Sequence, residues 1–171
     1  MRLGAAIVGD LRKVLADEVR ELYRSRFGLG IWEGYGSTES ACAMALNSHA
    51  LYRPGNSVGP LLPGMESRVV PVPGLASGGI LHVRGPNVMR AYYKQPEETA
   101  KAFTADGCMR TGDIGTMDAQ GYIRIVDRKK DMINVSGFNV YPNELENVVS
   151  LCPGVVECAV IGVADENQGE A

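Results

Sequence analysis

The chain has 171 residues, 45% of them hydrophobic, which is enough for one ordinary domain or for one domain and a fragment of another. Its 17 Lys and Arg residues against 20 Asp and Glu residues give a net charge of -3 without long blocks of like charge, which argues against a nucleic-acid partner. The apolar run at 5–8 is too short for a signal-peptide core or a membrane span, so we expect a cytoplasmic protein, in which peripheral membrane contact would leave no mark in the sequence.

Cysteine and histidine spacing gives no metal-ligand pattern, so we expect free thiols, mostly buried. The residues concerned are Cys42, Cys108, Cys152, Cys158, His49 and His82.

The first predicted element is an amphipathic helix over about 15–26, where apolar residues recur at helical spacing, and Gly28 and Gly30 end it. A short strand through 31–32 is expected to lead into 34–39, a tight loop with two glycines around a tyrosine.

Proline and glycine punctuate the region 57–90, which predicts short antiparallel strands at 67–72 and 80–84. Pro96 then stands at the first position of a short helix over 96–103 whose first turn is acidic.

Two further strands, at 114–118 and 122–126, flank a hairpin turn that ends in Gly121. The charged stretch 127–131 follows and is the best candidate for a domain boundary.

Beyond that boundary we expect a strand at 132–135, a glycine-containing loop, a helix from Pro142 and a strand at 155–163. About 40 residues are too few for a core of their own, so the second domain is expected to be incomplete. The fold class is therefore predicted as α/β (α+β mixed).

The loop 35–39 has the residue types that a nucleotide site needs. Glycine lets the backbone approach a ligand, a hydroxyl can bond a phosphate oxygen, the Glu39 carboxylate can hold Mg²⁺, and the face of Tyr35 can stack on a base. The same residues are also a helix start, with Ser37 or Thr38 as N-cap.

Asp113 could accept hydrogen bonds from two ribose hydroxyls, and Arg128 could fold back beside it across the predicted hairpin. The alternatives are a plain turn at 111–113 and a solvated charge cluster at 127–131. The segment 136–142 places a permissive glycine before a helix and is equally explained as a helix start. The residues alone thus indicate an α/β domain with a nucleotide loop and a charged hinge.

Five ordered motifs resemble the adenylate-forming superfamily of acyl-CoA synthetases, luciferases and peptide-synthetase adenylation domains. The last of them is similar to bacterial long-chain fatty acyl-CoA synthetases. The motifs lie at Glu33–Glu39, Arg84–Met89, Arg110–Asp113, Ile125–Ile133 and Val135–Glu144.

The resemblance implies an AMP-forming ligase that makes an acyl-adenylate from a fatty acid and ATP, then passes the acyl group to coenzyme A or to the phosphopantetheine of an acyl carrier protein. It implies that Tyr35 stacks on adenine, Thr38 contacts the α-phosphate and Glu39 holds Mg²⁺. Asp113 would bind the ribose, with Arg128 beside it. Gly36 and Ile125 complete the expected nucleotide-binding set.

The same resemblance implies that Lys130 is the hinge between two domains and that it is also a catalytic residue. Residues 1–129 would be the C-terminal portion of the large AMP-binding domain, with a small β-barrel-like subdomain, and 130–171 the hinge and an incomplete, mobile C-terminal α+β domain. Gly137 would lie beside the pantetheine channel in a second conformation.

Some features of the superfamily are absent, which predicts a fragment truncated at both ends and inactive in isolation. The phosphate loop would lie upstream of Met1, a lysine near the superfamily's C-terminus is missing, and the usual adenine segment is altered at 8–12. Two alternatives stay open: the acyl-carrier-protein synthetase half of a lysophospholipid acyltransferase, suggested by 61–66 and 72–75, and a catalytically inactive nucleotide-binding remnant.

Overall fold

A computed structural model describes residues 17–48, 57–73, 75 and 77–171. The altered segment at 8–12, the first two residues of the predicted helix, and His49 lie outside the described residues.

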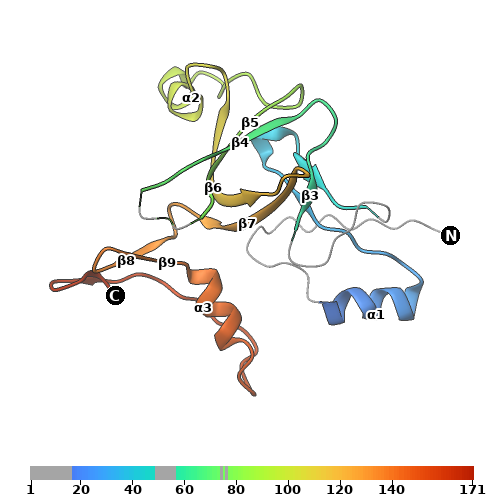
Figure 1. The fold of residues 1–171 in the computed structure, drawn as a ribbon, viewed down its shortest axis with the longest axis vertical. Coiled ribbons are helices and arrows are strands. Elements are labelled where there is room, and N and C mark those ends of the chain that lie inside the picture. The colour runs from blue at the N-terminus through green and yellow to red at the C-terminus, as the bar shows by residue number, and fades with distance from the viewer. Residues whose placement is uncertain (1–16, 49–56, 74, 76) are drawn as a thin grey trace.

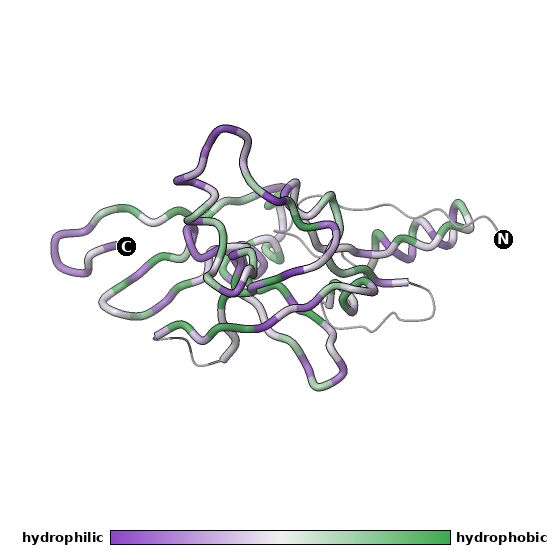
Figure 2. The backbone as a smooth tube through the Cα atoms, turned by 90° about the horizontal axis from the view of Figure 1, so that it is seen from above, coloured by the Kyte–Doolittle hydropathy of each residue, from purple (hydrophilic) through white to green (hydrophobic). Residues whose placement is uncertain are grey.

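The predicted N-terminal helix is confirmed as α1, Asp17–Phe27, and it stands away from the central sheet (Figure 1). It ends at Gly28, which has a φ of 63° and donates its backbone N–H to the carbonyl of Arg24 at 3.0 Å. Hydrophobic and hydrophilic residues alternate along it (Figure 2). The guanidinium of Arg20 forms a two-point ion pair with the buried carboxylate of Glu33, with Nη1 3.0 Å from Oε2, which ties the helix to the chain that follows.

The strand expected at 31–32 is wrong in position, because the pairing begins later. β1 (Gly34–Tyr35) pairs antiparallel with β2 (Ala45–Leu46). This short hairpin encloses η1, a 3₁₀ turn over Thr38–Ser40, so the predicted loop is a closed structure.

The main sheet has five antiparallel strands in the order β3-β7-β6-β5-β4. Leu81 and Val83 of β5, with Met109 of β6 and Ile123 of β7, belong to a hydrophobic core under one face of the sheet. The strands at 67–72 and 80–84 and the hairpin at Gly121 are confirmed. The expected barrel-like subdomain is an open sheet across the described residues. The strands are β3 (Gly59–Pro60), β4 (Glu66–Val70), β5 (Gly79–Arg84), β6 (Met109–Met117) and β7 (Tyr122–Arg128).

A β-bulge interrupts β6 at 111–113, where the sequence alone suggested a turn. Ile80 pairs with Ile114 and His82 with Arg110, so three residues of β6 lie opposite Leu81 of β5. Gly112, with a φ of 78°, supplies the backbone shape that the bulge requires. The bulge sets the direction of Asp113, the residue that follows Gly112.

The predicted helix at Pro96 is confirmed as α2 (Pro96–Ala102), with proline in its first turn. Arg110 of β6 donates from Nη1 to the carbonyl of Lys101 at 2.8 Å, which satisfies an end carbonyl of α2. The helix is thereby held against the strand that carries the bulge.

The C-terminal region forms a small sheet in the order β10-β11-β8-β9 with one helix. The predicted strand at 132–135 and the helix from Pro142 are confirmed. The loop expected from 136 to 140 instead contains a strand, because Ser136 and Gly137 both have positive φ and close a tight hairpin. The elements are β8 (Ile133–Val135), β9 (Phe138–Val140), α3 (Pro142–Val149), β10 (Ala164–Asp165) and β11 (Gly169–Glu170).

The strand predicted at 155–163 is wrong. This segment has no regular structure, and its apolar residues Val156 and Ile161 are exposed. Val163, at the end of the run, exchanges backbone hydrogen bonds with Ala171 at 3.0 and 2.9 Å, but the rest of the run pairs with no strand in the described part of the chain. A run of β-branched residues does not form a strand without such a partner and a face to bury.

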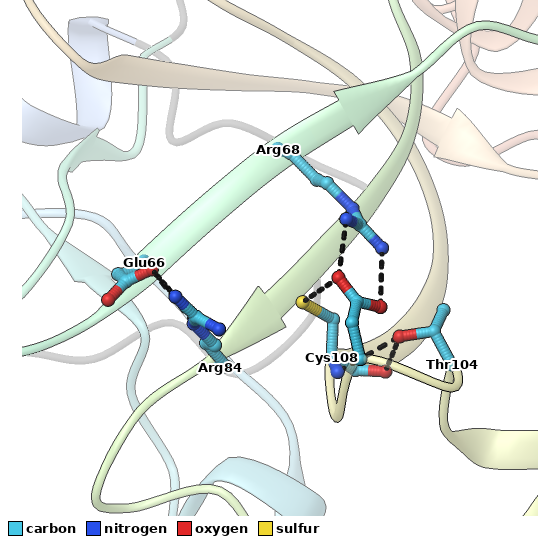
Figure 3. Close-up of polar contacts among 6 residues, drawn as sticks. Glu66, Arg68, Arg84, Thr104 and Cys108 are labelled. Carbon is cyan, nitrogen blue, oxygen red and sulfur yellow. Dashed lines mark hydrogen bonds and ion pairs between the residues drawn. The ribbon is translucent and has the colours of Figure 1, made fainter.

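Ion pairs line the exposed face of β4 and β5 (Figure 3). Arg84 donates from Nε to Glu66 at 2.8 Å, and Arg68 forms a two-point pair with Asp106 at 2.6 and 2.9 Å. Cys108 is buried next to this cluster. The expectation of mostly buried thiols is wrong, since Cys42 and Cys152 are exposed and Cys158 is half-buried.

The mixed α/β (α+β) class is confirmed. Across the part of the chain that the structure describes, no helix is both long and apolar enough to cross a membrane.

Candidate functional site

An open cleft of about 510 Å³ lies where η1, the bulge of β6 and the end of β7 meet. It brings together Glu39, Asp113 and Arg128, which the resemblance assigned to the nucleotide, and Lys130, which the resemblance made the hinge. The lining consists of Ser37, Glu39, Tyr92, Ala102, Met109, Arg110, Thr111, Gly112, Asp113, Arg128, Lys129 and Lys130.

The η1 turn carries Glu39 on a backbone fixed from within. Ser40, fully buried, accepts a hydrogen bond from the Ser37 backbone N–H at 2.9 Å and donates one to the Ser37 carbonyl at 3.0 Å. Gly36 is required just before the turn, because a Cβ there would lie 2.1 Å from the backbone oxygen of Cys42. The sequence Gly-Ser-Thr-Glu-Ser therefore closes on itself and presents Glu39 at the cleft.

A second segment holds this turn from outside. Asn87 donates from Nδ2 to the carbonyls of Ser40 at 2.8 Å and Ala43 at 2.6 Å, and the backbone N–H of Met89 donates to the carbonyl of Glu39 at 2.7 Å. The segment 87–92 thus fixes the position of η1 relative to the sheet.

The carboxylate of Glu39 accepts a hydrogen bond on Oε1 from the hydroxyl of Tyr92 at 2.9 Å. Its own backbone N–H, then the Tyr92 hydroxyl, and the nearby Arg128 lower the pKa of Glu39 below its ordinary value, although partial burial opposes them. Glu39 is therefore an anion at neutral pH, available to a cation.

Asp113, only 3% exposed, is held by two partners. Its Oδ2 accepts a hydrogen bond from the Tyr35 hydroxyl at 2.7 Å, and its Oδ1 lies 3.3 Å from Nε of Arg128. Asp113 and Arg128 are direct cross-strand partners in β6 and β7, which confirms that the hairpin brings them together.

Burial raises the pKa of Asp113 above its ordinary value, against the lowering effects of Tyr35 and Arg128. Burial, followed by the charge of Asp113, likewise raises the pKa of the Tyr35 hydroxyl, which stays protonated and donates. Tyr35 and Asp113 therefore form a buried hydrogen bond, shielded from solvent, in which the tyrosine hydroxyl donates and the carboxylate accepts.

Two buried oxygens in the cleft wall, Ser37 Oγ and Asp113 Oδ1, form no hydrogen bond among the described residues, although Nε of Arg128 lies 3.3 Å from Asp113 Oδ1 as an ion-pair partner. Buried polar atoms are nearly always paired in native proteins, so such atoms at a cleft call for a ligand with matching groups. A hydroxyl donor suits Asp113, and either a donor or an acceptor suits Ser37. These residues fit a phosphorylated, hydroxyl-bearing ligand.

The remaining predicted residues lie beside the cleft or away from it. Thr38 is exposed on η1 next to Glu39, and Ile125 packs against the hydrophobic core. Tyr35 is 1% exposed, with its ring in the core, so in this arrangement its hydroxyl contacts Asp113 and its ring offers no open face. Base stacking by Tyr35 stays a prediction.

Gly137 lies at a different pocket, of about 400 Å³, between the β6–β7 hairpin and the C-terminal hairpin. Lys130 lines both the first cleft and a third pocket of about 330 Å³ that includes Asn143 and Glu146 of α3. Lys130 is thus placed between the two parts of the chain that the sequence divides at 129 and 130, and that division stays a prediction.

Tyr92 and Lys129 line the cleft but were not singled out in the sequence. Tyr92 and Tyr93 are adjacent and identical in type, and only the structure distinguishes the half-buried one from its exposed neighbour. Lys129 is one charge within a basic run. The available signal was that Tyr92 lies just before the helix start at Pro96, which is too weak to identify a ligand contact.

The cleft has one carboxylate facing outward, not a cluster. In the described residues no group of three or more His, Cys, Asp or Glu side chains is arranged to hold a metal. A single carboxylate is nonetheless a typical protein ligand for Mg²⁺ that is also bound by substrate phosphates.

Comparison with known proteins gives two family matches. The AMP-binding enzyme family matches residues 9–93, and the AMP-binding enzyme C-terminal domain matches residues 144–171. The first match contains the η1 turn, and the second contains most of α3.

Among curated proteins, a long-chain-fatty-acid--CoA ligase of Yersinia pestis is 46% identical over 157 residues, covering 90% of this chain. The chain spans 28% of that relative's length. Among solved structures, ATP-bound MatB from Rhodopseudomonas palustris superposes with a TM-score of 0.79 at 35% identity, covering 98% of this chain and 33% of that one. A Mycobacterium tuberculosis fatty acyl CoA synthetase gives 0.69 at 33% identity, covering 99% and 33%.

Proposed function

The chain belongs to the AMP-binding enzyme family, and we propose that it forms the nucleotide-binding part of an ATP-dependent fatty acid:CoA ligase. The observation that carries the proposal is the cleft in which Glu39, Asp113, Arg128 and Lys130 meet, from segments up to 91 positions apart in the sequence (130 minus 39). The family match, the ATP-bound structural relative and the fatty-acyl ligases among the relatives support it.

In the proposed site, the orientation of the nucleotide follows from the two ends of the cleft. Asp113 accepts the ribose hydroxyls, and Arg128 faces the sugar and phosphate oxygens. In this orientation Ser37, which lines the cleft, and Thr38, which follows it on η1, would contact the phosphates, and Glu39 lines the same cleft. Gly36 permits the backbone packing that keeps this turn in place.

The proposed reaction has two steps that balance without a protein nucleophile. A carboxylate oxygen of the fatty acid bonds to the α-phosphorus of ATP while the bond to the β-phosphate oxygen breaks, which releases pyrophosphate. The sulfur of a thiol then bonds to the acyl carbon, AMP leaves, and the thiol proton passes to solvent. The site residues bind and orient; Glu39 would hold Mg²⁺, which when bound neutralises phosphate charge.

The acceptor is proposed to be coenzyme A, because the relatives' names specify CoA. An acyl carrier protein is the alternative acceptor and would leave the first step unchanged. We further propose that Lys130 is the hinge between parts 1–129 and 130–171, supported by its place at both the cleft and the pocket against α3.

The proposal is tested by fatty-acid-dependent exchange of pyrophosphate into ATP, measured in parallel on this chain and on the chain extended to its surrounding reading frame. We expect exchange in the extended protein, dependent on a long-chain fatty acid. No exchange in a folded extended protein would contradict the ligase and favour a nucleotide-binding protein without turnover.

A further inference from the structure

Tyr92 forms a side-chain hydrogen bond with Glu39 that hydrophobic core packing does not explain. Its hydroxyl reaches from the segment that follows β5 to Glu39 on η1, 53 positions earlier in the sequence, and donates to Oε1 at 2.9 Å. Tyr92 and Glu39 both line the cleft, and both are half-buried. The bond therefore joins two walls of the site at the carboxylate that faces the ligand.

Tyr92 is itself held in place from the opposite side. Its backbone N–H donates to Oγ1 of Thr99 at 3.0 Å, and the Thr99 hydroxyl donates to the Gln95 carbonyl at 2.8 Å, at the start of α2. Arg110 fixes the other end of that helix through the Lys101 carbonyl. Tyr92 is thus hydrogen-bonded to α2, and α2 is in turn hydrogen-bonded to the main sheet.

The contact is one of a set that runs along the same segment. Asn87 and Met89 fix the backbone carbonyls of η1, and Tyr92 alone among them contacts a side chain, that of Glu39. A flexible glutamate loses rotamer freedom when a hydrogen bond selects one orientation, so this loss is incurred before a ligand binds.

We propose that Tyr92 is a positioning residue that holds the Glu39 carboxylate toward the cleft for a magnesium ion carried by the nucleotide. The inference rests on the proposed nucleotide site and adds to it the residue that orients its metal ligand. Oε1 accepts the tyrosine hydroxyl, and in the proposed arrangement Oε2 would bind the cation. Tyr92 acts through Glu39 and does not touch the reacting atoms.

The chain offers a matched control. Tyr93 is adjacent and 84% exposed, and its ring lies near the ammonium of Lys94, outside the cleft lining. Tyr92→Phe and Tyr93→Phe each remove one hydroxyl and keep the ring. A difference between them therefore reports the bond to Glu39 and not the loss of a tyrosine.

The first readout is the affinity for ATP by calorimetry, with Mg²⁺ and with a chelator, on this chain and on its extended form. We expect Tyr92→Phe to reduce the gain in affinity that Mg²⁺ gives by about tenfold, the size of a lost hydrogen bond to a charged group, with metal-free ATP affinity unchanged. Tyr93→Phe should match the unsubstituted protein. An equal loss with and without Mg²⁺, or no loss, would overturn the proposal.

The second readout needs no ligand. Hydrogen exchange of the Met89 amide, which donates to the Glu39 carbonyl, should be faster in Tyr92→Phe than in Tyr93→Phe, because the two segments separate more easily. If the unsubstituted protein binds no ATP, the proposed nucleotide site is wrong. Equal exchange of the Met89 amide in the two variants would separately overturn the proposal that Tyr92 holds Glu39 in position.

Discussion

Buried ionisable side chains differ in whether a neighbour compensates for the loss of water. Asp113 has both a hydroxyl donor and a guanidinium beside it. His82 on β5 has the opposite surroundings. It is 8% exposed, stands in register between Arg68 and Arg110, and its Nδ1 has no hydrogen-bond partner within the described part of the chain.

His82 predicts a loss of stability on mild acidification. Burial, then the charges of Arg68 and Arg110, lowers the pKa of His82 below 6.5, although Asp106 opposes this. Below pH 6.5 the unfolded chain therefore binds a proton that the folded chain does not, so the free energy of unfolding falls as pH falls from about 6.5 toward the folded pKa. One proton limits the slope to about 1.4 kcal/mol per pH unit.

Urea denaturation at pH 7.5, 6.5 and 5.5 measures this slope. His82→Gln, which keeps a polar side chain but cannot gain charge, should have a shallower dependence on pH over that interval. Equal slopes in the two proteins would contradict the assignment to His82.

At the scale of elements, the site depends on two short structures that the residue patterns of strands and helices do not predict. One is the closed turn at η1, and the other is the bulge in β6. Gly36 allows the first, because the backbone of Cys42 and Ala43 occupies the place of a side chain. Gly112 allows the second through its positive φ.

Gly36→Ala is expected to displace the η1 hairpin and to cost about 3 kcal/mol or more, since backbone atoms and not a flexible side chain meet the new methyl group. Gly121→Ala is the comparator. Its Cβ would meet nothing within 4 Å, so only the strain of a φ of 81° applies, about 1–2 kcal/mol. Chemical denaturation of both variants measures the difference; a smaller cost for Gly36→Ala would contradict the packing described.

Local pattern was sufficient for elements whose signals are local. Apolar spacing placed α1, and prolines at a first turn placed α2 and α3. It failed where a tertiary neighbour decides. The apolar run 155–162 pairs with no strand in the described part of the chain, whereas 138–140 is a strand because the turn at Ser136 and Gly137 folds it onto β8.

For the site, a predicted hairpin was enough to bring Asp113 and Arg128 together, because strand register is a local property. The position of Tyr92 was not predictable, since it depends on how α2 and the segment after β5 pack against η1. Burial of the Tyr35 ring likewise depends on the core of the sheet, which no single motif encodes.

At the scale of the whole molecule, the main sheet carries the cleft at one end of the β6–β7 hairpin, and the C-terminal sheet and α3 follow directly after it (Figure 1). The chain passes from one part to the other through 129–131, where Lys129 donates its N–H to Gly112 at 2.9 Å. The cleft is thus built at the junction, with Asp113 in its wall and Lys130 at its rim.

The central property proposed for this cleft is that it binds a nucleotide through Asp113. The most direct test compares the affinities for AMP and for 2′,3′-dideoxy-AMP, by calorimetry, in the chain and in Asp113→Asn. We predict a preference for AMP of about tenfold or more, the size of hydroxyl bonds to a carboxylate, and little preference in the variant. Equal affinity for both nucleotides in the unsubstituted chain, or an unchanged preference in Asp113→Asn, would contradict the claim.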